Sequence, residues 1–265
     1  MTRATRPCVL VFAGLDPSGG AGMQADIEAI GGVGAHALPI ITALTVQDND
    51  RVFAVNPVDP AILRHQAQVL ADKIPIAAVK IGIVGNRANA AEIADLIREL
   101  RQRKPELPVV LDTVLGSGHG YALSDGGPER ALAPLISLAT LITPNLLEAT
   151  RLCPDAVGAD EQAQHLLSAG SENVLIKGGH GEGSSVTNRW FAKGIAEAWN
   201  WPRLPGEFHG SGCTLASAIA GLLAKGLAMY DALERGQSFC QEALSSSYAI
   251  APGQRMPNRR CVLRD

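Results

Sequence analysis

Segment 208–214 places two glycines, a cysteine and a threonine directly before an apolar, alanine-rich run at 215–223. That run is typical of a buried helix, and the glycines let the backbone approach a ligand closely. The free amides of the first helical turn would point at the same spot, where the helix dipole favours an anion. The segment therefore predicts a phosphate-binding cradle at residues 210–213.

Cys213 is the reactive side chain of this cradle. Positive potential at a helix start lowers the pKa of a thiol, so Cys213 is predicted to accept a proton beside the bound anion. The alternative is that Cys213 is a small buried apolar residue, as many cysteines are. A covalent nucleophile is a further alternative. It would need a histidine base oriented by a third group, and His209 is the candidate nearest in sequence.

A second glycine-rich segment, 13–22, follows an apolar run and precedes a helical pattern. It lacks the Gly-x-Gly-x-x-Gly spacing of dinucleotide-binding loops, and the chain has no Walker-type Gly-Lys-Ser/Thr. We interpret it as a loop that shapes a small-molecule pocket, with Asp26 on the following helix. The alternative is a tight strand–helix turn in which Asp16 is a local cap.

Polar residues end three further apolar runs, namely Gln47, Asp112 and Lys177. The Gln47 amide suits a heteroaromatic ring with ring nitrogens and an amino group, although a plain polar loop fits equally well. A carboxylate such as Asp112 at the end of a parallel strand is a common Mg²⁺ partner, usually through water. Lys177 is predicted to face phosphates, because a charged residue at the end of a buried strand needs a partner.

Asn145 and Glu148 have two interpretations of equal weight. Asn145 can cap the helix that follows Pro144, and Glu148 then falls at the capping-box position three residues later. Glu148 can equally support Mg²⁺ together with Asp112.

Short apolar runs alternate with helical patterns along the chain. Strands are predicted at 8–14, 37–46, 77–83, 108–112, 139–143 and 173–178, with an antiparallel pair at 185–191 and 195–199. Helices are predicted at 21–33, 60–72, 88–103, 128–137, 145–152, 159–169, 211–225 and 228–250. This alternation indicates a mostly parallel sheet covered by helices on both faces, within a single domain over 1–265. Ligands bind such sheets at the carboxyl ends of the strands, where the polar residues above fall.

The bulk composition excludes several classes of protein. A net charge of −3 and scattered cations do not indicate a nucleic-acid or membrane-surface binder. The five cysteines lie far apart without a Cys-x-x-Cys pair, which indicates a reducing compartment. The apolar run 8–14 is too short to span a bilayer and has no cleavage signature, so a cytoplasmic protein is expected.

Taken together, the motifs resemble the hydroxymethylpyrimidine/phosphomethylpyrimidine kinases of thiamine biosynthesis, which are ribokinase-like. The matching segments, in order, are 13–26, 41–47, 80–82, 111–114, 142–149, 177–180 and 209–214. The resemblance implies a three-layer α/β/α fold with a mostly parallel central sheet. It also implies MgATP-dependent phosphorylation of 4-amino-5-hydroxymethyl-2-methylpyrimidine and then of its monophosphate, and a homodimer.

The resemblance also implies a role for each matching residue. Gln47, Gly14 and Asp26 would hold the pyrimidine, and Lys177, Asn145 and Thr214 would contact ATP. Asp112 and Glu148 would support Mg²⁺ through water. Cys213 would accept the hydroxyl proton, with Gly210, Ser211 and Gly212 forming the anion hole.

One departure from the family pattern concerns the second phosphorylation. The family commonly has an Ala-Lys-Ser-Gly segment after the motif at 111–114, whereas this chain reads Leu-Gly-Ser-Gly-His-Gly at 115–120. Without that lysine, the second transfer is expected to be weaker or to rely on His119. A pyridoxal kinase is the nearest alternative, and a non-catalytic pyrimidine-binding regulator is a more distant one.

Overall fold

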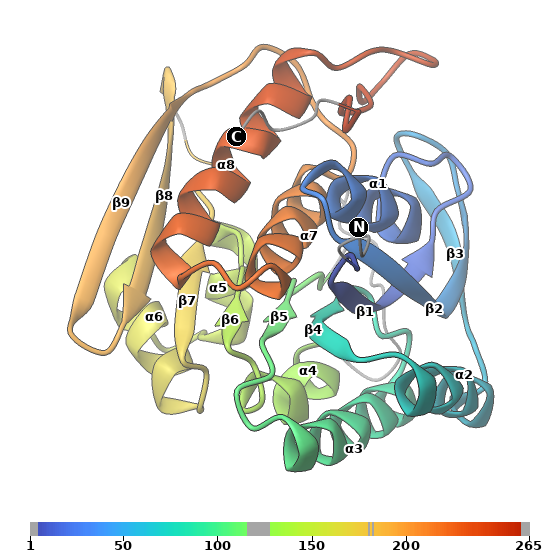
Figure 1. Ribbon diagram of the computed structural model, residues 1–265. Coiled ribbons are helices and arrows are strands. Elements are labelled where there is room, and N and C mark those ends of the chain that lie inside the picture. The colour runs from blue at the N-terminus through green and yellow to red at the C-terminus, as the bar shows by residue number, and fades with distance from the viewer. Residues whose placement is uncertain (1–4, 116–127, 180, 182, 261–265) are drawn as a thin grey trace.

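The computed structural model describes residues 5–115, 128–179, 181 and 183–260. Within them, nine strands form one sheet in the order β3-β2-β1-β4-β5-β6-β7-β8-β9 (Figure 1). The strands are β1 (Cys8–Leu15), β2 (His36–Gln47), β3 (Val52–Pro57), β4 (Ile76–Ile81), β5 (Val109–Leu111), β6 (Leu141–Ile142), β7 (Asn173–Ile176), β8 (Ser185–Ala192) and β9 (Ile195–Pro202). Strands β2, β1 and β4 to β7 are parallel, while β3, β8 and β9 pair antiparallel with their neighbours. The predicted mostly parallel sheet is confirmed.

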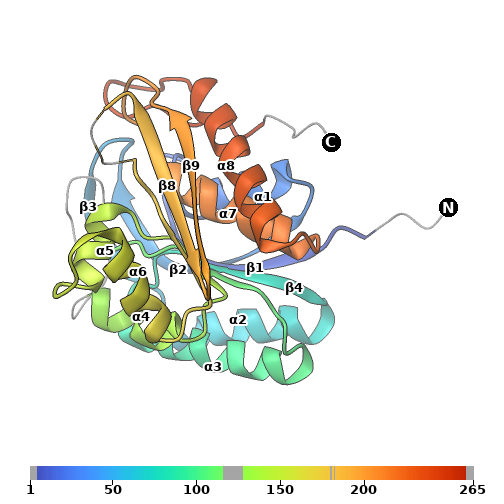
Figure 2. The ribbon, with the colours of Figure 1, turned by 90° about the vertical axis from the view of Figure 1, so that its left-hand side faces the viewer.

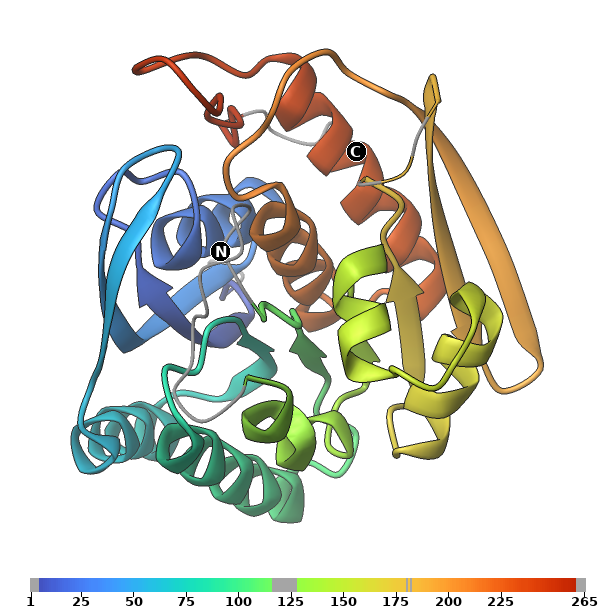
Figure 3. The ribbon, with the colours of Figure 1, turned by 180° about the vertical axis from the view of Figure 1, so that it is seen from behind.

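Helices cover both faces of the sheet, which gives the expected three layers (Figure 2). One face carries α1, α7 and α8, and the other carries α2 to α6. The helices are α1 (Gly22–Gly32), α2 (Pro60–Lys73), α3 (Arg87–Arg103), α4 (Pro128–Ile136), α5 (Leu146–Leu152), α6 (Gly158–Ser168), α7 (Ser211–Ala224) and α8 (Met229–Ser245). Seen from behind, α7 lies against the middle of the sheet between α1 and α8 (Figure 3).

Strand β1 shows why its sequence is apolar throughout. Leu10 and Phe12 belong to the core on the α2–α6 side, whereas Val9 and Val11 belong to the core on the α7 side. Successive side chains of a strand point to opposite faces, so a strand between two helical layers needs apolar residues at every position.

The predicted elements differ from the structure at two places. The edge strand β3 was not predicted, because it is short, half-exposed and ends in Asn56 and Pro57. The last helix, predicted to reach residue 250, ends at Ser245. The hydroxyls of Ser245 and Ser246 both donate to the Glu242 carbonyl, a local bond that competes with helical continuation.

Candidate active site

An ion pair joins the ends of two strands at the carboxyl edge of the sheet. Lys177 Nζ donates to Asp112 Oδ1 over 2.9 Å, and the Thr143 hydroxyl donates to the same oxygen over 3.2 Å. Burial by itself would raise the pKa of Asp112, but Lys177 and Lys80 outweigh it and the pKa is lowered. Burial would likewise lower the pKa of Lys177, but Asp112 and Glu148 outweigh it and the pKa is raised. Both members of the pair are therefore charged.

Helix α7 begins against this pair. Its N-cap, Gly210, has φ +73°, and a Cβ at this position would lie 2.2 Å from the Gly20 carbonyl oxygen. A Cβ at Gly212 would lie 3.1 Å from Lys177 Nζ. The start of α7 therefore lies directly beside the Lys177 ammonium. This close approach needs glycine at both positions, because a side chain would displace a neighbour.

The Cys213 thiol is next to these amides, but its pKa moves opposite to the prediction. Burial and the carboxylates of Asp112 and Asp26 raise it to about 12, although Lys80 and a backbone hydrogen bond from Gly22 lower it. The prediction of a lowered thiol pKa is therefore wrong for the chain without ligands. A helix start cannot offset the loss of solvation and two neighbouring negative charges.

Asp26 is fully buried and pairs with a buried lysine. Its carboxylate oxygens are each 2.8 Å from Lys80 Nζ, and one of them also accepts from the Ser217 hydroxyl over 2.6 Å. The side chains of Asp26 and Lys80 have no exposed area. The sequence assigned Asp26 to substrate contact, but in this structure its carboxylate instead neutralises a buried lysine.

Asn145 and Glu148 form the predicted capping box at the start of α5. Glu148 N donates to Asn145 Oδ1 over 2.9 Å, and Asn145 N donates to Glu148 Oε2 over 2.8 Å. The Thr113 hydroxyl donates to the same Glu148 oxygen over 3.2 Å. Burial raises the pKa of Glu148, with Lys177 opposing and Asp112 reinforcing the shift. The capping role of both residues is confirmed.

Gly14 and Gln47 lie at the ends of β1 and β2. A Cβ at Gly14 would be in ordinary contact with Ile83 and the Ala43 carbonyl. Gln47 is half-buried and interacts with the Asp16 carboxylate. The structure therefore brings the first glycine-rich loop and Gln47 together, as the sequence predicted.

Thr214 does not face this site, although the sequence placed it on ATP. It is buried, its hydroxyl donates to the Gly210 carbonyl over 2.8 Å, and the same oxygen accepts from Arg259 Nε over 2.8 Å. Arg259 also donates to the carbonyls of Gly20 and His209. This role could not be predicted from the sequence, where nothing distinguishes Arg259 from the other scattered cations.

A cavity of about 530 Å³ opens beside the start of α7. One end is lined by polar residues at the carboxyl edge of the sheet, namely Asn145, Lys177, Ser211 and Gly212. The remaining lining combines apolar and polar side chains. It includes Trp201, Phe208, Leu215, Cys240, Leu244 and Gln237. The sequence analysis did not identify this second group. Its members come from β9, the loop before α7, and helices α7 and α8, and they share no common spacing.

The carboxylates of the site suit a hydrated cation that also has other ligands. Asp112 Oδ2 is buried and, among the residues that the structure describes, has no hydrogen-bond partner. Across the same residues, no group of three or more His, Cys, Asp or Glu side chains could enclose a metal by itself. Mg²⁺ characteristically takes one or two carboxylates together with waters and substrate phosphates, and this donor set fits it.

In the described part of the chain, no helix is long and apolar enough to cross a membrane.

Comparison with known proteins agrees with the motifs. The model of the phosphomethylpyrimidine kinase family matches residues 16–258. The chain is 35% identical over 257 residues to a hydroxymethylpyrimidine/phosphomethylpyrimidine kinase from Rhizobium meliloti, covering 92% of this chain and 93% of the relative. It is 33% identical over 250 residues to the protein of the same name from Aquifex aeolicus, covering 92% and 96%.

Two solved structures are similar over most of the chain. An ADP complex of Bacillus subtilis pyridoxal kinase has a TM-score of 0.86 at 26% identity, covering 97% of this chain and 98% of that one. The phosphomethylpyrimidine kinase from Clostridium difficile has a TM-score of 0.76 at 32% identity, covering 90% and 100%.

Proposed function

This chain belongs to the phosphomethylpyrimidine kinase family, and we propose that it transfers the terminal phosphoryl group of ATP to 4-amino-5-hydroxymethyl-2-methylpyrimidine in thiamine biosynthesis. The observation that carries the proposal is the convergence of Lys177 and the amides that begin α7 at one end of the cavity, with Cys213 following these amides and close enough to Lys177 to raise the pKa of its ammonium. Phosphoryl transfer depends mostly on alignment and charge stabilisation, and these groups supply both.

The nucleotide lies in the cavity with its phosphates at the polar end. Lys177 is already charged there, and Ser211 and Gly212 begin a helix of 14 residues whose dipole favours negative charge. Asn145 lines the same end. The base and ribose occupy the larger part beside Trp201 and Leu215, where apolar area can be buried against them.

The pyrimidine lies across from the phosphates, at the ends of β1 and β2. The Gln47 amide can both donate to and accept from the amino group and ring nitrogens, and Gly14 would contact the ring from β1. Asp26 contributes indirectly, because its carboxylate neutralises the buried Lys80 ammonium.

Cys213 accepts the hydroxyl proton as the oxygen attacks phosphorus. With a thiol pKa of about 12 the free enzyme holds little thiolate at neutral pH, but the thiolate it does hold is a strong base. The thiol must first lose its own proton, so the rate is expected to rise with pH.

Asp112 would hold Mg²⁺ through water, and Glu148 would support it from the capping box. When bound there, Mg²⁺ would supply positive charge that offsets the negative charge of the phosphates during transfer. Lys177 pairs directly with the Asp112 carboxylate, and Lys80 adds positive charge nearby.

We also propose the second transfer, to the monophosphate, as a weaker activity. The segment that departs from the family pattern, 115–120 with His119, lies outside the described residues except for Leu115.

We further propose that the protein is a cytoplasmic homodimer and that the chain forms a single domain. Exposed Leu44, Val46 and Phe53 on the β2–β3 edge support association, and Cys8, Cys153 and Cys213, which form no disulfide in the described part, support a reducing compartment.

The test is turnover with MgATP on three acceptors, the hydroxymethylpyrimidine, its monophosphate and pyridoxal. Pyridoxal is included because pyridoxal kinases are among the similar structures. The proposal expects the highest kcat/KM with the pyrimidine alcohol, and Gln47→Ala should raise its KM while leaving that of ATP unchanged. A clear preference for pyridoxal would replace the proposed substrate, and turnover of none of them would end the proposal.

A further inference from the structure

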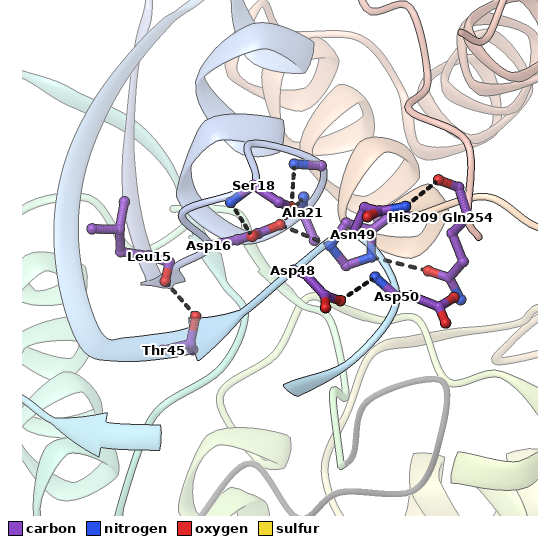
Figure 4. Close-up of polar contacts among 12 residues, drawn as sticks. Leu15, Asp16, Ser18, Ala21, Thr45, Asp48, Asn49, Asp50, His209 and Gln254 are labelled. Carbon is purple, nitrogen blue, oxygen red and sulfur yellow. Dashed lines mark hydrogen bonds and ion pairs between the residues drawn. The ribbon is translucent and has the colours of Figure 1, made fainter. Parts of the chain in front are cut away.

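The first glycine-rich loop and the loop before α7 are joined by a chain of polar side chains, Asp16–His209–Gln254 (Figure 4). His209 Nε2 lies 2.8 Å from Asp16 Oδ2, and His209 Nδ1 lies 3.1 Å from Gln254 Oε1. The Asp16 side chain is 2% exposed and that of His209 is 15% exposed. The three residues are far apart in sequence, so this chain is a feature of the tertiary fold.

At one end of this chain, Asp16 sets the backbone of the first loop. Its two carboxylate oxygens accept from Ser18 N over 2.8 Å and from Ala21 N over 2.7 Å. The loop leads directly into α1, whose first residue, Gly22, hydrogen bonds to Cys213. A shift of the Asp16 carboxylate would therefore move the acceptor side of the site.

At the other end, Gln254 lines the nucleotide cavity. Its backbone also reaches the acceptor side, because Asn49 Nδ2 donates to the carbonyls of Pro252 and Gln254 over 3.0 and 3.2 Å. Asn49 is buried and lies two residues after Gln47. Residue 254 thus contacts the cavity through its side chain and the acceptor loop through its main chain.

His209 is the central member of this chain, and its two ring nitrogens can bind Asp16 and Gln254 at the same time. The carboxylate accepts from Nε2–H, while the Gln254 amide can present either its oxygen or its NH₂ group to Nδ1. The Gln254 amide can therefore pair with Nδ1 either as a donor or as an acceptor. His209 itself does not line the cavity, so its action on a nucleotide must pass through Gln254.

We propose that His209 is a positioning residue that transmits occupation of the nucleotide cavity to the acceptor-binding loop, through Gln254 on one side and Asp16 on the other. The proposal rests on the proposed placement of the nucleotide in the cavity. Transmission needs a ligand that favours one arrangement of the loop, and a nucleotide packed against Gln254 would do so. By linkage, the acceptor should in turn strengthen nucleotide binding.

Hydrogen–deuterium exchange of the full-length protein tests the proposal without the acceptor. With Mg²⁺ and the non-hydrolysable ATP analogue AMP-PCP, amide exchange in segment 16–24 should slow by about fivefold in the wild type. His209→Ala should abolish this slowing at saturating AMP-PCP, while calorimetry shows that the analogue still binds. His65→Ala, at an exposed histidine on α2, should behave as the wild type.

Two conservative variants separate transmission from simple loss of structure. His209→Gln can still reach Asp16, and His209→Asn can still reach Gln254, but neither connects both. Each should fold with a Tm near that of the wild type and still lose the slowing. Persistence of the slowing in either variant, or its absence in the wild type with AMP-PCP bound, would overturn the proposal. The substrate proposal is judged separately, because a wild type that shows the slowing but does not phosphorylate the pyrimidine would refute only that.

Discussion

Lys177 reaches across β6 to place its ammonium 2.9 Å from Asp112 on the far side, since the two residues follow β7 and β5. The pair lies beside Gly212 at the start of α7. The Asp112 carboxylate stabilises the charged form of Lys177. The ammonium can also contact an anionic ligand bound at the start of α7.

Lys177→Met should therefore lower kcat/KM for ATP by about 100-fold, in the range seen when a preorganised charge-stabilising donor is removed. It also leaves the buried Asp112 carboxylate without its cation, so the pKa of Asp112 should rise. Steady-state kinetics measures the first effect. Lys193→Met, at an exposed lysine next to the β8–β9 turn, should have wild-type kinetics. Equal kinetics in the two variants would show that Lys177 contacts no phosphate.

Gly210→Ala should damage both stability and turnover. The added methyl group would lie 2.2 Å from the Gly20 carbonyl oxygen, at a backbone φ of +73°. Gly194→Ala is a matched control, because Gly194 has φ +74° and open space around its Cβ position. We expect the control to lose about 1 kcal/mol of unfolding free energy from backbone strain alone. Urea denaturation should show a larger loss for Gly210→Ala, and similar losses for the two would refute the close approach of the loops.

Arg259→Met should destabilise the fold by about 2–4 kcal/mol, because it leaves buried acceptors at Gly20 and Thr214 without a donor. Arg260→Met, at the exposed neighbouring arginine, should change the unfolding free energy by less than about 0.5 kcal/mol. Chemical denaturation of both variants provides the comparison. If Arg259→Met were as stable as the control, the guanidinium would not join the two loops.

The acid side of the stability curve should depend on Asp16. Burial would raise the pKa of its carboxyl, but hydrogen bonds from His209, Gln47 and Ser18 lower it from 3.8 to about 2. A lowered carboxyl pKa adds stability that is complete above the unfolded-state value and is lost as the pH falls through the folded-state value. Asp16 should thus contribute roughly 2 kcal/mol at neutral pH, fading between about pH 4 and pH 2.

The measurement is the unfolding free energy of the wild type and Asp16→Asn across that range. The two curves should converge at the acid end, with Asp155→Asn, at an exposed carboxylate, following the wild type throughout. Parallel curves for wild type and Asp16→Asn would contradict the lowered pKa.

The sequence predicted the sheet, its helical cover and the segments that form the site, because these depend on local patterns. Apolar runs such as 8–14 and glycines at fixed offsets specify strands and close approaches wherever they occur. The capping box of Asn145 and Glu148 was predictable for the same reason, since it needs only four consecutive residues.

Features that depend on tertiary contacts were not predictable. The pKa of Cys213 is raised by burial and by Asp112 and Asp26, which lie 101 and 187 positions away along the chain, as their residue numbers show. Burial of Arg259, the pairing of Asp26 with Lys80 and the apolar lining of the cavity likewise bring together residues whose spacing carries no period.

The role of Cys213 is tested most directly by the turnover number of Cys213→Ala with saturating MgATP and hydroxymethylpyrimidine. We predict a fall of about 100-fold or more, with AMP-PCP binding unchanged, because only a transition-state proton transfer is lost. Turnover equal to that of the wild type would contradict the assignment of Cys213 as the group that accepts the hydroxyl proton.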